Sequence, residues 1–224
     1  MTGALTSPPV STLIVTMDGP SGTGKSTVSR EVARRAGLPH LDTGAYYRAA
    51  TLAALRSSVD LDSEAEVVGA VVRAEITEEE GRIYLDGEDV SDEIRGRQVT
   101  EHVSKVSAHP RVRGLLVERQ REWAQRHGGR AVVEGRDIGS VVFPEAEIKI
   151  YLDADPLVRA TRRAQQLGQD PAAVIADLKR RDELDSSRKA SPLTVPDGAT
   201  VVDTSDLTFD QVVEKILALV DAHS

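Results

Sequence analysis

The sequence predicts an α/β protein in which a parallel sheet is covered by helices on both faces. Short apolar or β-branched stretches alternate along the chain with segments whose apolar residues recur at helical spacing. A glycine-rich turn joins the first stretch directly to a helix. Hydrophobic residues make up 40% of the 224 residues, which is enough for a real core in one large domain.

The N-terminal part begins with a tail at 1–11 that contains two prolines and is expected to be loose. A buried strand at 12–17 follows and ends in a tight turn. Residues 26–36 place apolar side chains on one helical face and stop at Gly37, a common helix end. A brief strand at 40–41 and a helix at 45–56 come next.

The middle of the chain departs from this alternation. Residues 64–74 have helical periodicity, but 75–90 alternate with a period of two and carry turn signals at 80–81 and 86–87. We therefore predict a small antiparallel sheet within an insertion at about 60–105. Residues 60–101 hold fourteen acids and four arginines, a net −10, so the rest of this −8 chain is slightly basic. We interpret the acidic excess chiefly as a solvated surface.

The C-terminal part returns to alternating elements. It carries expected helices at about 97–107 and 111–127, strands at 131–134 and 147–152, helices near 156–167 and 171–184, a strand at 200–202 and a last helix at 209–222.

Composition excludes several classes of protein. The chain has no cysteine, which removes disulfides and thiolate chemistry and fits a reducing, cytoplasmic compartment. The apolar run 13–17 is too short to cross a membrane, and no basic residue precedes it as in a signal peptide. The net charge of −8 and only seven aromatic residues argue against nucleic acid as a partner.

One motif points to a nucleoside triphosphate. The stretch Gly19-Pro-Ser-Gly-Thr-Gly-Lys-Ser26 matches the P-loop pattern G-x-x-x-x-G-K-[ST] at every fixed position, and it lies between an apolar strand and an amphipathic helix. Its glycines let backbone N–H groups turn toward an anion, Lys25 is expected to reach the β- and γ-phosphates, and Ser26 to ligate Mg²⁺. The residues predicted to bind ATP here are Gly19, Pro20, Ser21, Gly22, Thr23, Gly24, Lys25, Ser26 and Thr27.

The motif does not by itself name the reaction. A switch GTPase is excluded because its guanine reader needs asparagine, and the chain contains none. A motor or regulatory ATPase usually presents a hydrophobic strand that ends in paired acids, whereas the strand ending at Asp153 is followed by Ala154. That class remains the alternative to a phosphotransferase.

Charged clusters follow several predicted strands, where ligands bind in open α/β sheets. Asp42-Thr-Gly-Ala-Tyr-Tyr-Arg48 follows the second strand, and Glu134-Gly-Arg-Asp-Ile-Gly139 follows the third core strand. Further arginines lie on the later helices. For any single arginine a solvated helix face is the simpler explanation, but a phosphoryl-transfer centre needs several cations together.

With these strings, and with Leu85-Asp-Gly-Glu-Asp-Val90, Pro110-Arg-Val-Arg113 and Arg181-Asp-Glu-Leu-Asp-Ser-Ser-Arg188, the chain resembles the bacterial cytidylate kinases over nearly all of residues 12–220. These are P-loop nucleoside monophosphate (NMP) kinases. The resemblance implies a three-layer fold with a five-stranded parallel core at about 12–59, 106–155 and 196–224. It also implies an NMP-binding insertion at about 60–105 and a short lid at about 156–192.

The resemblance also assigns roles residue by residue. It implies that Arg48 and Arg136 hold the acceptor phosphate near Thr43 and Tyr47, and that Asp185 and Arg181 bind the ribose. Side chains that would read the cytosine edge are Ser104, Arg113, Asp137 and Arg188. Those of the basic lid over ATP are Arg159, Arg162 and Arg163. The residues implied to be catalytic are Lys25, Arg136, Arg159, Arg162 and Arg181.

We therefore expect a monomeric enzyme that moves the γ-phosphoryl of Mg·ATP to CMP or dCMP. No general base is expected, because a monophosphate oxygen is already anionic at neutral pH; alignment, charge neutralisation and exclusion of water are the protein's tasks. Departures from the family pattern are small. Ser140 stands where many relatives have threonine and Thr43 where some have serine, so both positions keep a hydroxyl group. Leu184 stands where some members have arginine, which leaves the number of lid cations open.

Overall fold

The computed structural model describes residues 12–168, 170–187 and 191–223; the expected tail at 1–11 and Arg188 lie outside these ranges. Five parallel strands form one sheet in the order β2-β6-β1-β7-β8, which confirms the predicted fold class. Their bounds are β1 Leu13–Asp18, β2 His40–Asp42, β6 Arg130–Glu134, β7 Ile148–Asp153 and β8 Thr200–Asp203. After β1 the chain places β2 and β6 on one side of it and then β7 and β8 on the other. The strand order therefore reverses at β1, and the carboxyl end of a strand at such a point is a common ligand site.

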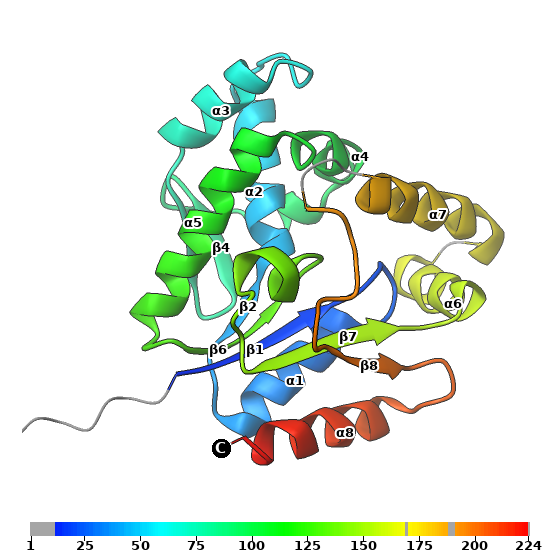
Figure 1. Ribbon diagram of the computed structural model, residues 1–224. Coiled ribbons are helices and arrows are strands. Elements are labelled where there is room, and N and C mark those ends of the chain that lie inside the picture. Colours follow the sequence, from blue (N-terminus) through cyan, green and yellow to red (C-terminus); the bar gives the residue numbers. More distant parts are fainter. Residues whose placement is uncertain (1–11, 169, 188–190, 224) are drawn as a thin grey trace, which may run out of the picture.

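Helices cover both faces of the sheet (Figure 1). One face carries α1 (Lys25–Ala36) and α8 (Phe209–Asp221), and the other carries α2 (Thr43–Arg56) and α5 (Pro110–Arg126). All six residues of β1 are buried, as expected of a central strand with helices on both sides.

Local sequence signals account for most helix ends. Helix α1 ends at Gly37 as predicted, and this residue has a left-handed φ of 64°. Helix α2 begins at Thr43, two residues earlier than expected, because the Asp42 carboxylate caps it by accepting a hydrogen bond from the Ala45 N–H at 3.2 Å. Near the C-terminus, Thr208 and Gln211 form a capping box at the start of α8.

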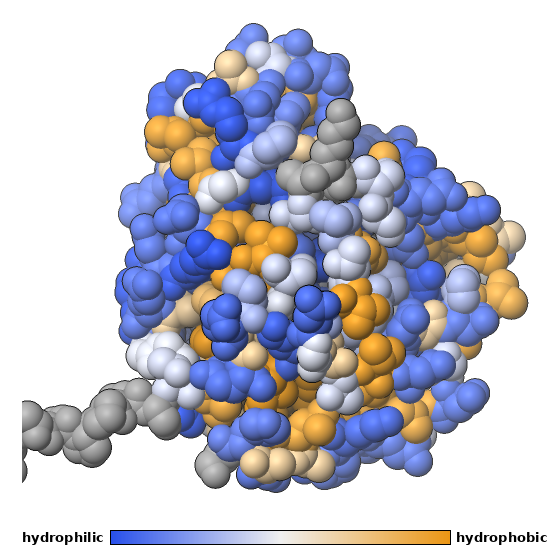
Figure 2. Space-filling view, viewed as in Figure 1, coloured by the Kyte–Doolittle hydropathy of each residue, from blue (hydrophilic) through white to orange (hydrophobic). Residues whose placement is uncertain are grey.

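The insertion contains the predicted antiparallel sheet. Its elements are α3 (Glu64–Arg73), β3 (Ile76–Glu79), β4 (Arg82–Leu85), β5 (Glu88–Asp89), the 3₁₀ turn η1 (Glu93–Arg95) and α4 (Arg97–Val106). Both residues of each turn, at 80–81 and 86–87, have positive φ, as two-residue hairpins require. The turn η1 was not expected. Figure 2 shows a mostly hydrophilic surface around α3, in line with the acidic composition.

The insertion shares a hydrophobic core with the sheet. Val67, Ile83 and Ile94 of the insertion belong to the same buried cluster as Leu41 and Val133 of the sheet. Folding of the insertion is therefore linked to folding of the parallel sheet through apolar burial.

Two further helices, α6 (Pro156–Leu167) and α7 (Pro171–Ser187), lie beside the strands β7 and β8 (Figure 1). They pack on each other through Ala160, Ala164, Val174 and Leu178. Within the described ranges, no helix is both long enough and apolar enough to cross a membrane.

Candidate active site

The loop 19–24 joins β1 to α1 and has the backbone that the P-loop motif predicts. Gly19, Gly22 and Gly24 have φ of 138°, 84° and 91°, a region that favours glycine. A Cβ on Gly19 would lie 2.0 Å from the Leu152 carbonyl oxygen, and one on Gly22 would lie 3.0 Å from the Arg159 carbonyl oxygen. The glycines therefore let the loop pack closely against both β7 and α6.

Lys25 is buried at the start of α1, and its Nζ donates to the Pro20 carbonyl oxygen at 2.6 Å. Burial and the nearby Arg136 cation together hold the pKa of Lys25 well below its usual value, while Glu134 and Asp18 act in the opposite direction. The ammonium group thus lies inside the curl of the loop, where an incoming phosphate would favour its charged form.

Ser26 and Glu134 form a buried pair behind the loop. Ser26 Oγ donates to Glu134 Oε2 at 3.0 Å. The other oxygen, Glu134 Oε1, is buried and accepts no hydrogen bond from the described residues, while His40 Nε2 lies 3.8 Å from it. Burial raises the pKa of this carboxyl group above its usual value. A hydroxyl and an unsatisfied carboxylate oxygen suit Mg²⁺ with its bound waters.

Glu134 was not predicted as part of a metal site. The sequence pattern singled out Asp153 at the end of β7, as a poor match to the paired acids of ATPases, and that side chain is exposed and accepts a hydrogen bond from the Ala154 N–H. The signal was present on β6, where the apolar run Ala131–Val133 is followed directly by Glu134. Both β6 and β7 pair with β1, so the two acids are distinguished only by the fold around them, which places Glu134 against Ser26 of α1 and leaves Asp153 exposed.

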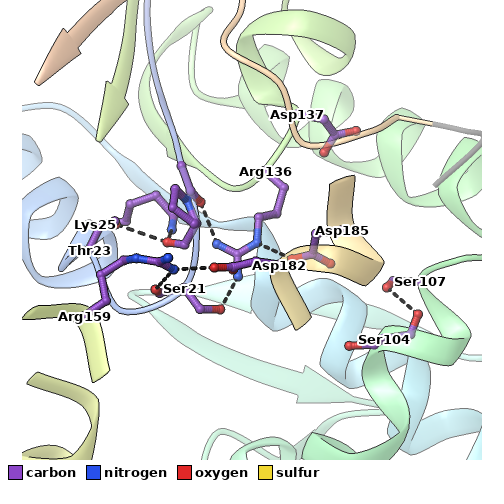
Figure 3. Close-up of polar contacts among 12 residues, drawn as sticks. Ser21, Thr23, Lys25, Ser104, Ser107, Arg136, Asp137, Arg159, Asp182 and Asp185 are labelled. Atoms are coloured by element: carbon purple, nitrogen blue, oxygen red, sulfur yellow. Dashed lines mark hydrogen bonds and ion pairs between the residues drawn. The ribbon is translucent and has the colours of Figure 1, made fainter. Parts of the chain in front are cut away.

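Arg136 links the phosphate loop to α7 (Figure 3). Its Nη1 donates to the Gly19 carbonyl oxygen at 2.6 Å, its Nη2 to Ser21 Oγ at 2.5 Å, and its Nε to Asp185 Oδ2 at 2.8 Å. Burial lowers the pKa of Arg136, and the nearby carboxylates of Asp182 and Glu134 oppose that shift. The guanidinium group therefore lies between the predicted donor and acceptor sites.

The arginines predicted for the lid take different positions. Arg159 is buried on α6 and donates to the Ser21 carbonyl oxygen of the loop at 3.1 Å. Arg162 instead donates to the hydroxyl and carbonyl oxygens of Thr204, at 2.9 and 2.7 Å. Thr204 Oγ1 in turn donates to the Thr23 carbonyl oxygen at 3.5 Å, so Arg162 contacts the loop only through Thr204. Arg163 is partly buried on α6, and Arg181 lies on α7.

Two of the residues predicted to read the base, Arg113 and Asp137, form a buried ion pair. Arg113 Nη2 donates to Asp137 Oδ2 at 2.5 Å, and both side chains are only 4% exposed. The Arg113 guanidinium also lies 5.1 Å from the centre of the Tyr47 ring. Ser104 is on α4, and its carbonyl oxygen accepts from Ser107 Oγ at 3.1 Å (Figure 3). This buried pair of a carboxylate and a guanidinium group offers both acceptors and donors, which can distinguish donors from acceptors on a base edge.

Two of the predicted acceptor-phosphate residues, Arg48 and Thr43, contact the insertion and the end of β6. Arg48 Nη1 donates to Thr100 Oγ1 at 2.9 Å and to the Ile94 carbonyl oxygen at 3.1 Å, so residues of the insertion orient it. Thr43 Oγ1 donates to the Glu134 carbonyl oxygen at 2.7 Å. Residues at the ends of β2 and β6 are thereby joined at one edge of the sheet.

Asp18 holds the segment that carries Arg136 and Asp137. Its two carboxylate oxygens accept from the N–H groups of Ile138 and Gly139, each at 2.7 Å. Those residues begin a single π turn, η2 (Ile138–Val142), which was not expected. Burial raises the pKa of Asp18 to about 6 although both hydrogen bonds act to lower it.

A P-loop at the reversal point of a parallel sheet, on which Lys25, Arg136 and Arg159 converge, is typical of a P-loop phosphotransferase. The sequence model of the family described as cytidylate kinase matches residues 15–222. The chain belongs to the cytidylate kinase family and is an ATP-dependent nucleoside monophosphate kinase.

Similar proteins agree with this assignment. The chain is 54% identical to a cytidylate kinase of Rhodococcus opacus (strain B4), over 96% of this chain and 97% of that protein. It is also 54% identical to one of Nocardia farcinica (strain IFM 10152), over 93% of each chain. Among solved structures, TT1252 from Thermus thermophilus has a TM-score of 0.50 at 21% identity, over 95% of this chain and 97% of that one, which supports the fold alone.

Proposed function

We propose that this enzyme transfers the γ-phosphoryl group of Mg·ATP to CMP or dCMP, and that the cluster around the phosphate loop performs the transfer. The observation that carries the proposal is the convergence of Lys25, Arg136 and Arg159 on one loop, beside the buried pair of Arg113 and Asp137. Three cations can neutralise a phosphoryl group in transfer, and the buried pair can select the acceptor base.

In this proposal the loop and α1 bind the donor. The backbone N–H groups of 19–26 and the start of α1 hold the phosphates, and Lys25 is released from the Pro20 carbonyl oxygen to a phosphate oxygen. Arg159 and Arg136 add fixed guanidinium groups. Because the acceptor phosphate is already a nucleophile, alignment of the two nucleotides and exclusion of water supply the rate enhancement.

Magnesium fits the donor side. Ser26 Oγ and the unsatisfied Glu134 Oε1 would hold the ion and its waters, and when bound it would neutralise charge on the phosphates. The other half of the carboxylate keeps the Ser26 hydroxyl in place through its 3.0 Å hydrogen bond.

Specificity for cytosine is proposed to come from the buried polar set. A cytosine edge offers an amino donor and two acceptors, which match a carboxylate and a guanidinium group. A base with the opposite pattern would leave Asp137 or Arg113 unsatisfied, at a cost of about 1–3 kcal/mol for each lost partner.

An ADP-release assay tests the proposal directly. Mg·ATP would be mixed with CMP, dCMP, UMP, AMP, GMP and dTMP, and the highest kcat/KM is expected for a cytidine nucleotide. Another preferred acceptor would contradict the base assignment, and ADP release independent of any monophosphate would support the ATPase alternative.

A matched pair of variants tests the role of the loop. Lys25→Met keeps the buried aliphatic stem and removes the cation, so we expect phosphoryl transfer to fall about 10²-fold or more while the thermal unfolding midpoint stays similar. Lys215→Met removes an exposed lysine on α8 and serves as control. Near-normal turnover of Lys25→Met would contradict the assignment of the loop.

We also propose that the enzyme works as a cytoplasmic monomer, and that the insertion at about 60–105 and the region 156–192 act as its NMP-binding and lid parts. The absence of cysteine supports the reducing compartment. Arg48, which two insertion residues orient, supports the role of the insertion.

A further inference from the structure

Asp182 is a carboxylate near the loop 19–24 to which the sequence motifs assign no role. It lies on α7, and Figure 3 shows it between the guanidinium groups of Arg159 and Arg136. One oxygen, Oδ2, accepts a hydrogen bond from Arg159 Nη1, and the other, Oδ1, is buried without a hydrogen-bond partner among the described residues. The side chains of Arg159 and Asp182 are only 10% and 19% exposed.

The protein holds two of the three guanidinium nitrogens of Arg159, Nε and Nη1. Nε donates to the Ala154 carbonyl oxygen at 3.2 Å, and Nη1 donates both to the Ser21 carbonyl oxygen at 3.1 Å and to Asp182. For Nη2, the described part of the chain offers no acceptor. Two of the three guanidinium nitrogens are thus held by protein acceptors, and Nη2 keeps its donors available.

The backbone of Arg159 is already fixed against the loop, so Asp182 acts on the orientation of the guanidinium group. A Cβ on Gly22 would lie within 3.1 Å of both the carbonyl oxygen and the Cβ of Arg159, which shows how closely α6 packs there. The two carbonyl acceptors are neutral, and the carboxylate is the charged partner, which makes the stronger hydrogen bond.

Attachment of α7 to the protein does not depend on this ion pair. The buried side chains Ala160, Ala164, Val174 and Leu178 already hold α7 against α6. A carboxylate buried beside the catalytic cations is costly to desolvate, so a role in the site explains its position better than a role in holding the helices together.

We propose that Asp182 is a positioning residue that fixes the Arg159 guanidinium group with its Nη1 edge on the phosphate loop, so that Nη2 serves the phosphates of the donor nucleotide. The inference rests on the proposed function, in which Arg159 binds those phosphates. In this proposal Asp182 contributes to catalysis chiefly through Arg159, the cation to which it is hydrogen-bonded.

The test compares Asp182→Asn with Glu183→Gln. Glu183 is the exposed neighbour on the same helix, and the two changes remove the same charge. Because a hydrogen bond to a charged group contributes about 1.5–3 kcal/mol, Asp182→Asn should lower kcat about ten- to a hundredfold and leave the KM for CMP within about twofold. Glu183→Gln should match the wild type. Thermal unfolding midpoints of both variants would show that they fold.

A double-mutant cycle with Arg159→Ala identifies the route. If Asp182 acts through Arg159, Asp182→Asn should cause no further loss of kcat in the Arg159→Ala background. An undiminished further loss, or equal effects of Asp182→Asn and Glu183→Gln, would overturn the inference. Tighter ATP binding and faster turnover by Asp182→Asn would also overturn it, because Asp182 would then compete with phosphate. Normal kcat of Arg159→Ala would instead contradict the proposed function of Arg159.

Discussion

At the scale of single residues, the site consists of buried charges that are each held by a specific partner. Glu134 is the example that bears on the proposed Mg²⁺ site, since one oxygen accepts a hydrogen bond from Ser26 Oγ and the other accepts nothing from the described residues. A neutral amide at this position would keep the shape of the side chain but lose its charge. The two functions of the carboxylate can therefore be tested by one substitution.

We predict that Glu134→Gln raises the Mg²⁺ concentration needed for half-maximal activity about tenfold or more, because residues that orient metal ligands commonly affect affinity or activity to that extent. The measurement is a Mg²⁺ titration of CMP-dependent ADP release at fixed ATP. Glu214→Gln, in an exposed pair with Arg35, is the control. An unchanged Mg²⁺ requirement would remove Glu134 from the metal site.

Asp18 leads to a prediction about pH. Its pKa is about 6 in the folded protein against a usual 3.8, so the folded state binds the proton more tightly than the unfolded state does. The stability that Asp18 contributes is therefore greatest below pH 4, declines between pH 4 and 6, and is constant above. The total change is about 3 kcal/mol.

The measurement is urea unfolding of the wild type and Asp18→Asn from pH 4 to 7. The free energy of unfolding of the wild type minus that of Asp18→Asn should fall as pH rises to 6. Burial lowers the pKa of His40 to about 4, so the stabilisation that neutral His40 contributes declines as pH falls below 6.5. This contribution is the same in both proteins and cancels in the difference. A difference that is constant or rises with pH would contradict the burial of an ionisable Asp18.

At the scale of elements, the sequence predicted what depends on local signals. The turns at 80–81 and 86–87, the end of α1 at Gly37 and the strand–loop–helix at 13–36 follow from glycine, periodicity and capping chemistry. The turn η1 and the π turn η2 were not predicted. The π turn starts where the carboxylate of Asp18, which is far away in sequence, accepts hydrogen bonds from two N–H groups. Glu134 and Asp182 were missed for the same reason: their partners are set by strand order and helix packing.

The contact between the phosphate loop and α6 is an element-scale feature that a pair of glycines can test. Gly22 and Gly24 have similar positive φ, but an added Cβ meets Arg159 at Gly22 and nothing within 4 Å at Gly24. Both alanine variants carry the conformational cost of about 1 kcal/mol, and only Gly22→Ala also forces α6 away.

We therefore expect Gly22→Ala to lower the free energy of unfolding by about 1–3 kcal/mol more than Gly24→Ala, the range for inserting atoms into a packed interior. The measurement is denaturant unfolding without nucleotide, so that effects on ligand binding do not enter. Equal losses from the two variants would mean that α6 is not in close contact with the loop.

At the scale of the whole molecule, the charge of −8 is the average of an acidic insertion and a slightly basic remainder. The arginines of the remainder include those at the phosphate loop, so the average conceals a local site for polyanions. The acidic insertion nonetheless shares its hydrophobic core with the sheet. The two parts thus differ in net charge but share one hydrophobic core.

The shared core predicts that the two parts unfold together. Trp123, the single tryptophan, is buried on α5 and donates from Nε1 to Glu78 Oε2 of the insertion at 2.6 Å, so its fluorescence reports on that contact. Far-UV circular dichroism reports on all helices. Because one cluster spans both parts, we expect the two probes to give the same urea midpoint.

The variant Leu116→Ala tests whether the two parts unfold together. Leu116 is fully buried on α5 in the shared cluster, and its truncation should cost about 2–5 kcal/mol and shift both midpoints equally. Val202→Ala, in the separate cluster on the α1 and α8 face, should also shift both probes together, by a smaller amount. If Leu116→Ala moved only the fluorescence midpoint, the insertion would be an independent folding unit, and the continuity of its core with the sheet would have no energetic consequence.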